Sequence, residues 1–283
     1  MIEVIILLAI ALIWIIFATV QDLKSREIAN WLNFSLIIFA LGFRFFYSLF
    51  SGTGEDFSFF IQGVIGLGIF FVLGNILYYS RMFAGGDAKL MIALGAILPL
   101  YNNTIDNLKF FLIFFLAFLI SGAIYGIISI LYFSLKNFKP FKKELSEQFK
   151  KKKKLVFLGM SFGVISMILG LFFNFFFSFG IMLFLTPYVY IYVTAVDEAC
   201  MIKNVKTKNL TEGDWLYKNV KIGKRYMKAD WDGLEKKDIR ELRKRYSKIK
   251  IKQGIPFSPV FLISYIIIVT LFLLKINWIN LFR

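Results

Sequence analysis

Two aspartates stand where they could do chemistry together. Asp22 directly follows the first long apolar stretch, and Asp87 follows the pair Gly85-Gly86 and opens a further apolar stretch. Ionisable residues at a membrane boundary are costly and are therefore candidates for function. Two nearby carboxylates cannot both ionise easily, so one keeps a proton. The ionised one can then take a proton from water while the protonated one polarises a carbonyl, which is aspartic protease chemistry.

Each aspartate alone also has a simpler interpretation. Asp87 could cap a helix after a glycine turn, where the positive end of the helix dipole favours a carboxylate. Asp22 could simply end a helix at the membrane interface. Gly85 and Gly86 let the backbone approach a substrate or another helix closely. Lys89 could keep Asp87 ionised, or could extend to lipid phosphate at the interface.

The composition requires that these residues sit in a membrane protein. The 283 residues are 58% hydrophobic and include 35 Phe, with a mean hydropathy of +0.69, whereas soluble domains are about 45–50% apolar. The absence of His excludes Ser–His–Asp and Cys–His nucleophiles and His-ligated metals. A single cysteine, Cys200, excludes an internal disulfide and a CxxC zinc site. No cofactor or metal is expected.

The apolar stretches predict the elements that must position the two aspartates. A spanning helix needs about 20 apolar residues, so the longest stretch is predicted to form two helices with a turn near Asn174 to Gly180. The fourth is short and ends at Pro99. We therefore predict an all-α polytopic membrane protein with about eight transmembrane helices and a small α+β cytoplasmic domain before the last one. The stretches are 2–20, 31–50, 58–79, 88–100, 109–134, 155–197 and 256–279.

Three domains are predicted from these stretches and from the charge. Residues 1–197 form the membrane domain with spans 1–7, residues 198–255 form a basic cytoplasmic domain, and residues 256–283 hold the last helix. The chain carries a formal net charge of +16. Basic residues gather in 198–255 and in the connecting loop 135–154, which holds nine Lys.

The distribution of Lys and Arg predicts the orientation. Loops 51–57 and 101–108 carry no basic residue, so the positive-inside rule places them outside and places 21–30 and 80–87 inside, with both termini outside. The basic segments are expected to face anionic lipid. Nucleic-acid binding is not expected, because the charge lies between membrane spans. Arg44, near the outer end of the second span, is interpreted as extending to the interface.

Local patterns predict structure within 198–255. Residues Lys218 to Met227 alternate loosely around Gly223 and predict a hairpin. Asp232 and Glu235 have capping-box spacing, which predicts a helix from Leu234 to Tyr246 with Asp232 at its N-cap.

The chain resembles the archaeal prepilin and preflagellin peptidases, which are GxGD aspartic membrane proteases of the type IV prepilin peptidase family. The motifs that carry the resemblance are Asp22 with Ile28-x-Asn30, then Gly86-Asp87-x-Lys89-Leu90, and Ile255-Pro256-x-x-Pro259 at the start of the last span. Two positions depart from the pattern: Ala84 replaces the first glycine of GxGD, and Ala29 replaces a frequent proline. Bacterial relatives also carry a cysteine-rich zinc region and can N-methylate their product. The single cysteine excludes that region, so we predict peptidase activity without methylation.

The resemblance implies a substrate and a site. The substrates are prepilins and preflagellins with class III signal peptides, in which a short basic stretch is cut from a hydrophobic helix at the cytoplasmic face of the cell membrane. Asp22 and Asp87 are the implied catalytic pair. Asp197 and Glu198 could receive the basic residues of the substrate or could simply end a helix. The candidates for supporting or substrate-binding roles are Gly85, Gly86, Lys89, Glu27, Asp197 and Glu198.

Two other classes of function stay open at this point. The protein could be a non-enzymatic scaffold for pilus or secretion assembly whose basic domain docks an acidic partner. It could also be a proton-coupled transporter that uses Asp22 and Asp87 as carriers. A transporter is expected to place its carboxylates nearer the bilayer midplane and often shows internal repeats. A scaffold does not explain two aspartates at matched depth.

Overall fold

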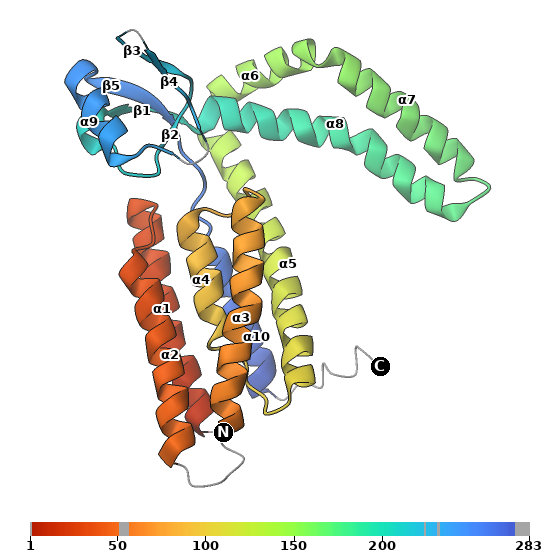
Figure 1. The fold of residues 1–283 in the computed structure, drawn as a ribbon. Helices are drawn as coiled ribbons and strands as arrows, with labels where there is room; N and C mark the ends of the chain where they lie inside the picture. Colours follow the sequence, from red (N-terminus) through yellow and green to blue (C-terminus); the bar gives the residue numbers. More distant parts are fainter. Residues whose placement is uncertain (1, 51–56, 224, 231–232, 275–283) are drawn as a thin grey trace. The chain divides into compact units, whose positions relative to one another are not determined.

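The structure is a computed structural model that describes residues 2–50, 57–223, 225–230 and 233–274. Most of these residues are helical (Figure 1). The chain divides into two compact units, one formed by Met1–Gly126 with Pro256–Arg283 and the other by Ile127–Ile255. Three sequence-based predictions fall partly outside the described residues, namely the outer loop 51–57, the N-cap Asp232 and the end of the last span at 279.

The first unit is a bundle of apolar helices. In lipid every backbone polar group must be bonded internally, so long apolar stretches become helices. The helices of this unit are α1 (Ile2–Ser25), α2 (Asn30–Phe50), α3 (Phe57–Tyr79), α4 (Gly85–Gly95), α10 (Ser258–Leu273) and the part of α5 (Thr104–Lys136) up to Gly126.

Five helices of the described chain are long and apolar enough to cross a membrane, by length and composition: α1, α2, α3, α5 and α8 (Asn174–Cys200). A sixth, α10, is a shorter apolar helix. The protein is therefore a mostly helical, polytopic membrane protein. The predicted count of eight spans stays a prediction.

The first and last helices of this unit pack together although they are far apart in the sequence. Leu7, Ala11 and Ile15 of α1 are almost fully buried, at helical spacing along one face. The hydroxyl of Tyr265 in α10 donates a hydrogen bond of 2.8 Å to the backbone oxygen of Leu8. The start of α10 is thereby held beside the end of α1, where Asp22 lies.

Helix α4 is short and enclosed. Its 11 residues extend about 16 Å at 1.5 Å per residue, well below the roughly 30 Å of a bilayer core. A β-carbon on Gly95 would lie 2.6 Å from the backbone oxygen of Gly66 in α3, so the two helices can pack this closely only through glycine. The predicted short fourth stretch is thus surrounded by protein, and its helix ends at Gly95 rather than near Pro99.

Arg44 closes the far end of α4. The carbonyls at a helix C-terminus lack partners within the helix, and the buried Arg44 guanidinium donates to the backbone oxygens of Ala96, Ile97 and Pro99 at 2.6–3.0 Å. It also donates to the oxygen of Phe59 at 2.8 Å. The side chain is 0% exposed, so the interpretation of Arg44 as extending to the interface is wrong.

In the second unit, α7 (Lys153–Leu169) and α8 form a helical hairpin. The prediction that 155–197 forms two helices is confirmed, but the turn comes earlier than expected, at residues 170–173. A β-carbon on Gly163 would lie 2.8 Å from the backbone nitrogen of Phe184, so this glycine lets the two helices approach closely.

The segment predicted as the connecting loop 135–154 contains a helix, α6 (Phe138–Lys151). Phe141 is buried, and its ring packs on Tyr192 of α8 with 5.1 Å between centroids. Lys139, Lys142 and Lys143 are exposed. The helix is amphipathic, and sequence reasoning that counted only its lysines missed its apolar face.

A small α+β region lies before the last helix, as predicted. Strands β1 (Ile202–Lys206), β5 (Lys248–Lys252) and β2 (Trp215–Leu216) form an antiparallel sheet in that order. Its buried side chains include Leu216, Ile249 and Ile251. The remaining elements are a short 3₁₀ helix (Thr207–Asn209), strands β3 (Val220–Ile222) and β4 (Arg225–Met227), and helix α9 (Lys236–Arg245).

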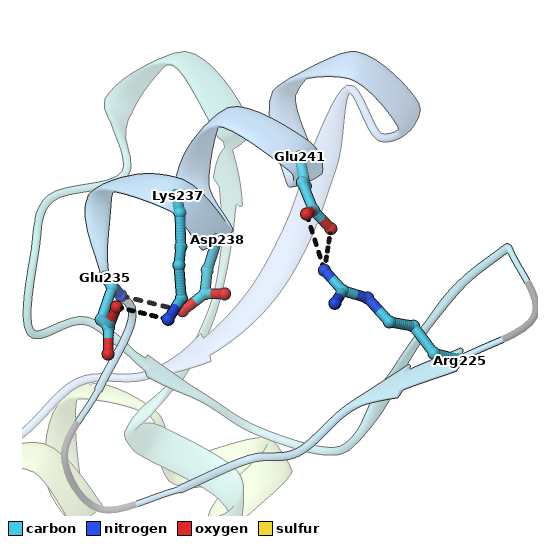
Figure 2. A network of polar contacts seen from close by, with 5 residues as sticks. All are labelled: Arg225, Glu235, Lys237, Asp238 and Glu241. Carbon is cyan, nitrogen blue, oxygen red and sulfur yellow. Dashed lines mark hydrogen bonds and ion pairs between the residues drawn. The ribbon is translucent and has the colours of Figure 1, made fainter.

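The predicted hairpin within 218–227 is confirmed by β3 and β4. Helix α9, however, begins later than predicted, with Glu235 as its N-cap and Asp238 completing the capping box (Figure 2). The reason is that Gly233 has a positive φ of 77° and Leu234 is buried, so these residues form the turn before the helix. Figure 2 also shows Arg225 of β4 paired with Glu241 of α9.

Candidate active site

Asp22 lies in the last turn of α1 and is buried, with 6% of its surface exposed. Its Oδ2 accepts a hydrogen bond of 3.1 Å from the backbone N–H of Ser258, the first residue of α10. The first N–H groups of a helix have no partner within it, and the positive end of the helix dipole favours a carboxylate there. The side chain is therefore fixed by the start of the last helix.

The turn after Asp22 is closed by its own hydrogen bonds. Arg26 has a positive φ of 60°, and its N–H donates to the backbone oxygen of Asp22 at 2.8 Å. The side-chain oxygen of Gln21 accepts the N–H of Ala29 at 3.1 Å. These contacts end α1 and lead within a few residues to α2, with Ile28 buried between the two helices.

Asp87 lies in the first turn of α4 and is half-buried. The N-cap of this helix is Ala84, which has no side-chain cap. Asp87 is the third helical residue and lies near the backbone N–H of Ala84, rather than standing at the N-cap itself.

The two aspartates are close enough for their charges to interact. They come from helices that the chain separates by α2 and α3, so packing between elements must bring them together. A β-carbon on Gly86 would lie 3.3 Å from the β-carbon of Ile28 and 3.5 Å from its nitrogen. The turn after Asp22 therefore rests on the glycine next to Asp87, and Gly86 allows this close approach.

Gly85 is less constrained than its neighbour. A β-carbon there would meet only the ring of Tyr78, at 3.8 Å, which is ordinary contact. Of the two predicted glycines, Gly86 is the one that the packing requires.

Two residues at the start of α2 bind the start of α4. The side-chain amide of Asn33 donates to the backbone oxygen of Gly86 at 3.3 Å. The ammonium of Lys89 donates to the side-chain oxygen of Asn30 at 2.6 Å. Lys89 thus has its hydrogen bond with Asn30 of α2, a partner that neither sequence-based interpretation named.

Sequence reasoning missed Asn33 and Ser258. Asn33 is 1% exposed and stands among apolar residues of α2, and a buried amide in an apolar helix is itself a signal that it bonds something specific. Ser258 carries no such signal, because it acts through its backbone N–H.

The other candidate acids are placed differently. Glu27 is exposed in the turn after Asp22. Asp197 and Glu198 belong to the second unit and have partners within it: Lys252 binds Asp197 at 2.5 Å, and the hydroxyl of Tyr217 donates to Glu198 at 2.8 Å. That hydrogen bond raises the pKa of the Tyr217 phenol above its usual value. Both acids thus tie the end of α8 to the chain that follows it.

Within the described residues, no group of three or more Asp, Glu, Cys or His side chains could hold a metal ion. The polar groups around the pair include carboxylates, backbone N–H groups, the amide of Asn33 and the guanidinium of Arg26, whose charge interacts with Asp22. This set suits proton transfer between carboxylates, water and a peptide.

The fold and the paired aspartates define a polytopic membrane protein with a two-carboxylate site. Residues 9–127, which include both aspartates, match the type IV leader peptidase family. The resemblance to prepilin and preflagellin peptidases is confirmed for this part of the chain.

Curated relatives point the same way. A preflagellin peptidase of Methanocaldococcus jannaschii is 36% identical over 95 residues, which are 34% of this chain and 39% of the relative. One of Methanococcus maripaludis is 36% identical over 91 residues, 32% of this chain and 38% of the relative. One of Methanococcus voltae is 30% identical over 93 residues, 33% of this chain and 38% of the relative. The chain thus matches less than half the length of these relatives. No solved structure matches it.

Proposed function

We propose that the protein is an aspartic endopeptidase that cleaves the class III signal peptides of prepilins or preflagellins. The observation that carries the proposal is the close packing of Gly86, which precedes Asp87 of α4, against Ile28 in the turn after Asp22 of α1. Both aspartates lie within the segment that matches the leader peptidase family. The named relatives are preflagellin peptidases, which supports this substrate class.

The proposed reaction uses the pair as base and acid. The ionised carboxylate takes a proton from a water molecule, whose oxygen attacks the carbonyl carbon of the scissile peptide bond. The protonated carboxylic acid gives its proton to the carbonyl oxygen, so that charge does not accumulate there. The carbon–nitrogen bond then breaks, and the amine leaves with a proton from the carboxylic acid that the first step formed. A hydroxyl proton of the tetrahedral intermediate returns to the other carboxylate, which restores the starting state of the pair. No metal or cofactor takes part in this proposal.

The surrounding residues position the pair in this proposal. Ser258 holds Asp22 through its N–H, and Asn33 holds the backbone beside Asp87. Gly86 permits the contact with Ile28, and Lys89 ties α4 to Asn30. Glu27 is exposed a few residues after Asp22, so we propose that its carboxylate binds the basic residues of the signal peptide. Asp197 and Glu198 have partners of their own and are not needed for this role.

We further propose that the protein lies in the cell membrane with the aspartate pair facing the cytoplasm. The basic segments 135–154 and 198–255 would then be cytoplasmic and contact anionic lipid. The basic stretch of the signal peptide would stay on the same side. Side-specific labelling of single cysteines introduced into 101–108 and 135–154, in a Cys200→Ser background, tests this orientation: the first should react from outside and the second from inside.

A scaffold or a proton-coupled transporter is less well supported. The family match and the named relatives are peptidases, and neither alternative accounts for them. Nucleic-acid binding has no support beyond the basic charge.

The direct test is cleavage by the purified protein in liposomes. The probe is a synthetic peptide with a short Lys-rich leader followed by an apolar helix of about 20 residues. We expect mass spectrometry to find one cut between leader and helix for the wild type and for the control Asp106→Asn, and none for Asp87→Asn. An inactive wild type, or an Asp87→Asn variant that cuts as fast as the wild type, would contradict the proposal.

A further inference from the structure

A cavity of about 790 Å³ lies between α2, α3 and α4 of the first unit. These three helices pack on one another and lie side by side in Figure 1. Most of the lining is apolar and includes Phe34, Leu67, Phe71 and Ile92. The cavity is therefore an apolar groove within the membrane bundle.

The polar lining gathers at one end of the groove. Asn33 is near the start of α2, Tyr78 near the end of α3, and Gly85 and Lys89 are at the start of α4. Gly85 and Lys89 each lie two residues from Asp87 in the sequence. The groove thus begins beside one member of the aspartate pair.

The groove is long enough for several turns of a helix. Its lining on α3 extends from Val64 to Tyr79, about 22 Å at 1.5 Å per residue. This is roughly two thirds of the thickness of a bilayer core. An apolar helix that leaves the aspartate pair toward the membrane could therefore lie along it for most of its length.

Glycines shape the floor and the opening. At Gly74, a β-carbon would lie 2.8 Å from Ile92 and 3.0 Å from the backbone oxygen of Ala88, so α3 and α4 are in close contact there. At Gly68, which comes six residues earlier in α3, a β-carbon would meet no atom within 4 Å. Close packing between helices in a membrane depends on such small residues.

We infer that this groove binds the apolar helix of the substrate while its leader junction lies at Asp22 and Asp87. The inference rests on the proposed function and adds the place where the uncut part of the substrate is held. In lipid there is little hydrophobic gain from burying an apolar helix, so van der Waals fit to a shaped groove is what can select one. Continuity with the Asp87 end distinguishes this groove from a site for a lipid chain.

The test is disulfide capture of the substrate peptide in liposomes. The protein carries Cys200→Ser and Asp87→Asn, so that the peptide is not consumed, and a single new cysteine, either Gly68→Cys or Gly42→Cys. Gly42 is the matched control because it too has open space around it. It lies on α2 outside the groove. Gly42 is 12 residues from Asn30, the first residue of α2, and Gly68 is 11 residues from Tyr79, the last residue of α3. Both are about 17 Å from the same end of the bundle.

The probe is the Lys-rich leader peptide described above, with one cysteine placed in turn at successive positions of its apolar helix. We expect Gly68→Cys to capture it at least tenfold more than Gly42→Cys, with a maximum every three or four peptide positions. Equal capture at both sites, or capture only at Gly42→Cys, would overturn the inference. The inference would also be overturned if the thiol of Gly68→Cys reacted with a small lipid-soluble maleimide equally fast with and without peptide, because the peptide then does not cover the groove.

This experiment separates the two proposals. Cleavage by the wild type without capture at Gly68→Cys would leave the peptidase and remove the groove. Capture at Gly68→Cys by a protein whose wild type cuts nothing would leave the groove and remove the peptidase. A second variant, Gly68→Phe, should fill the groove and raise the KM for the full peptide at least tenfold, whereas Gly42→Phe should not.

Discussion

The carboxylate of Asp22 accepts the backbone N–H of Ser258 at 3.1 Å, across 236 residues of sequence. One side chain is therefore both a proposed catalytic group and a partner for the start of the last helix. The two roles can be separated, because an asparagine keeps an oxygen that accepts a hydrogen bond but cannot act as a carboxylate.

We predict that Asp22→Asn and Asp22→Ala both lose cleavage but differ in stability. Asp22→Asn keeps an acceptor for Ser258 and should unfold close to the wild-type temperature. Asp22→Ala leaves that N–H without a partner and should lose about 1 kcal/mol, as when a helix cap is removed. Thermal unfolding in detergent measures the difference. Equal stability of the two variants would show that the contact with α10 contributes little.

Gly86→Ala should reduce cleavage while the protein stays folded. The new methyl group would lie 3.3 Å from the β-carbon of Ile28, so the turn after Asp22 must move away from Asp87. Displacement of reacting groups by a fraction of an ångström is costly, and we expect kcat to fall about tenfold or more with KM little changed. Gly126→Ala, where the β-carbon has open space, is the control. Wild-type kcat for Gly86→Ala would show that this contact does not set the geometry of the pair.

Arg44 should be required for stability, although it lies far from the chemistry. Its guanidinium satisfies four backbone oxygens, and Arg44→Met leaves them without that partner in the interior. We expect a loss of at least about 2 kcal/mol. Arg44→Lys should recover only part of it, because an ammonium cannot reproduce the fork of donors. The exposed Arg240→Met serves as the control, and equal thermal unfolding of Arg44→Met and wild type would contradict this role.

Of the acids outside the pair, Glu27 of the first unit should affect the KM for the substrate peptide, whereas Asp197 of the second unit should not. Glu27→Gln should raise the KM for the Lys-rich peptide by about two- to fivefold, which corresponds to one exposed ion pair of up to about 1 kcal/mol. Asp197→Asn should leave that KM unchanged, since its carboxylate binds Lys252. Cleavage kinetics over a range of peptide concentrations measure both. A larger effect from Asp197→Asn than from Glu27→Gln would reverse the assignment.

The helices of the membrane bundle could be predicted from the sequence because apolar length alone nearly determines them. The hairpin within 155–197 followed from the same reasoning, since the stretch is too long for one span. The position of the turn in this hairpin did not follow from the sequence, because it depends on close packing between the two helices, such as that of Gly163 against α8.

Other parts needed tertiary packing or were overlooked. Strand β5 has the alternation Lys248-Ile249-Lys250-Ile251-Lys252, which is a strand pattern that a count of basic charge alone does not reveal. The burial of Arg44 could not be foreseen, because its partners are backbone oxygens of α3 and of the chain directly after α4. For the candidate site, the types and depth of Asp22 and Asp87 predicted the pair. The contacts of Ser258 and Asn33 arise from packing that one sequence does not reveal.

The most direct test is a double-mutant cycle on cleavage of the Lys-rich leader peptide by wild type, Asp22→Asn, Asp87→Asn and the double variant. If the two carboxylates act as one unit, each single variant should lose about 10²- to 10⁴-fold in kcat or more, and the double variant should lose little beyond that. A single variant that keeps kcat within tenfold of the wild type, or losses that simply multiply in the double variant, would contradict the paired mechanism.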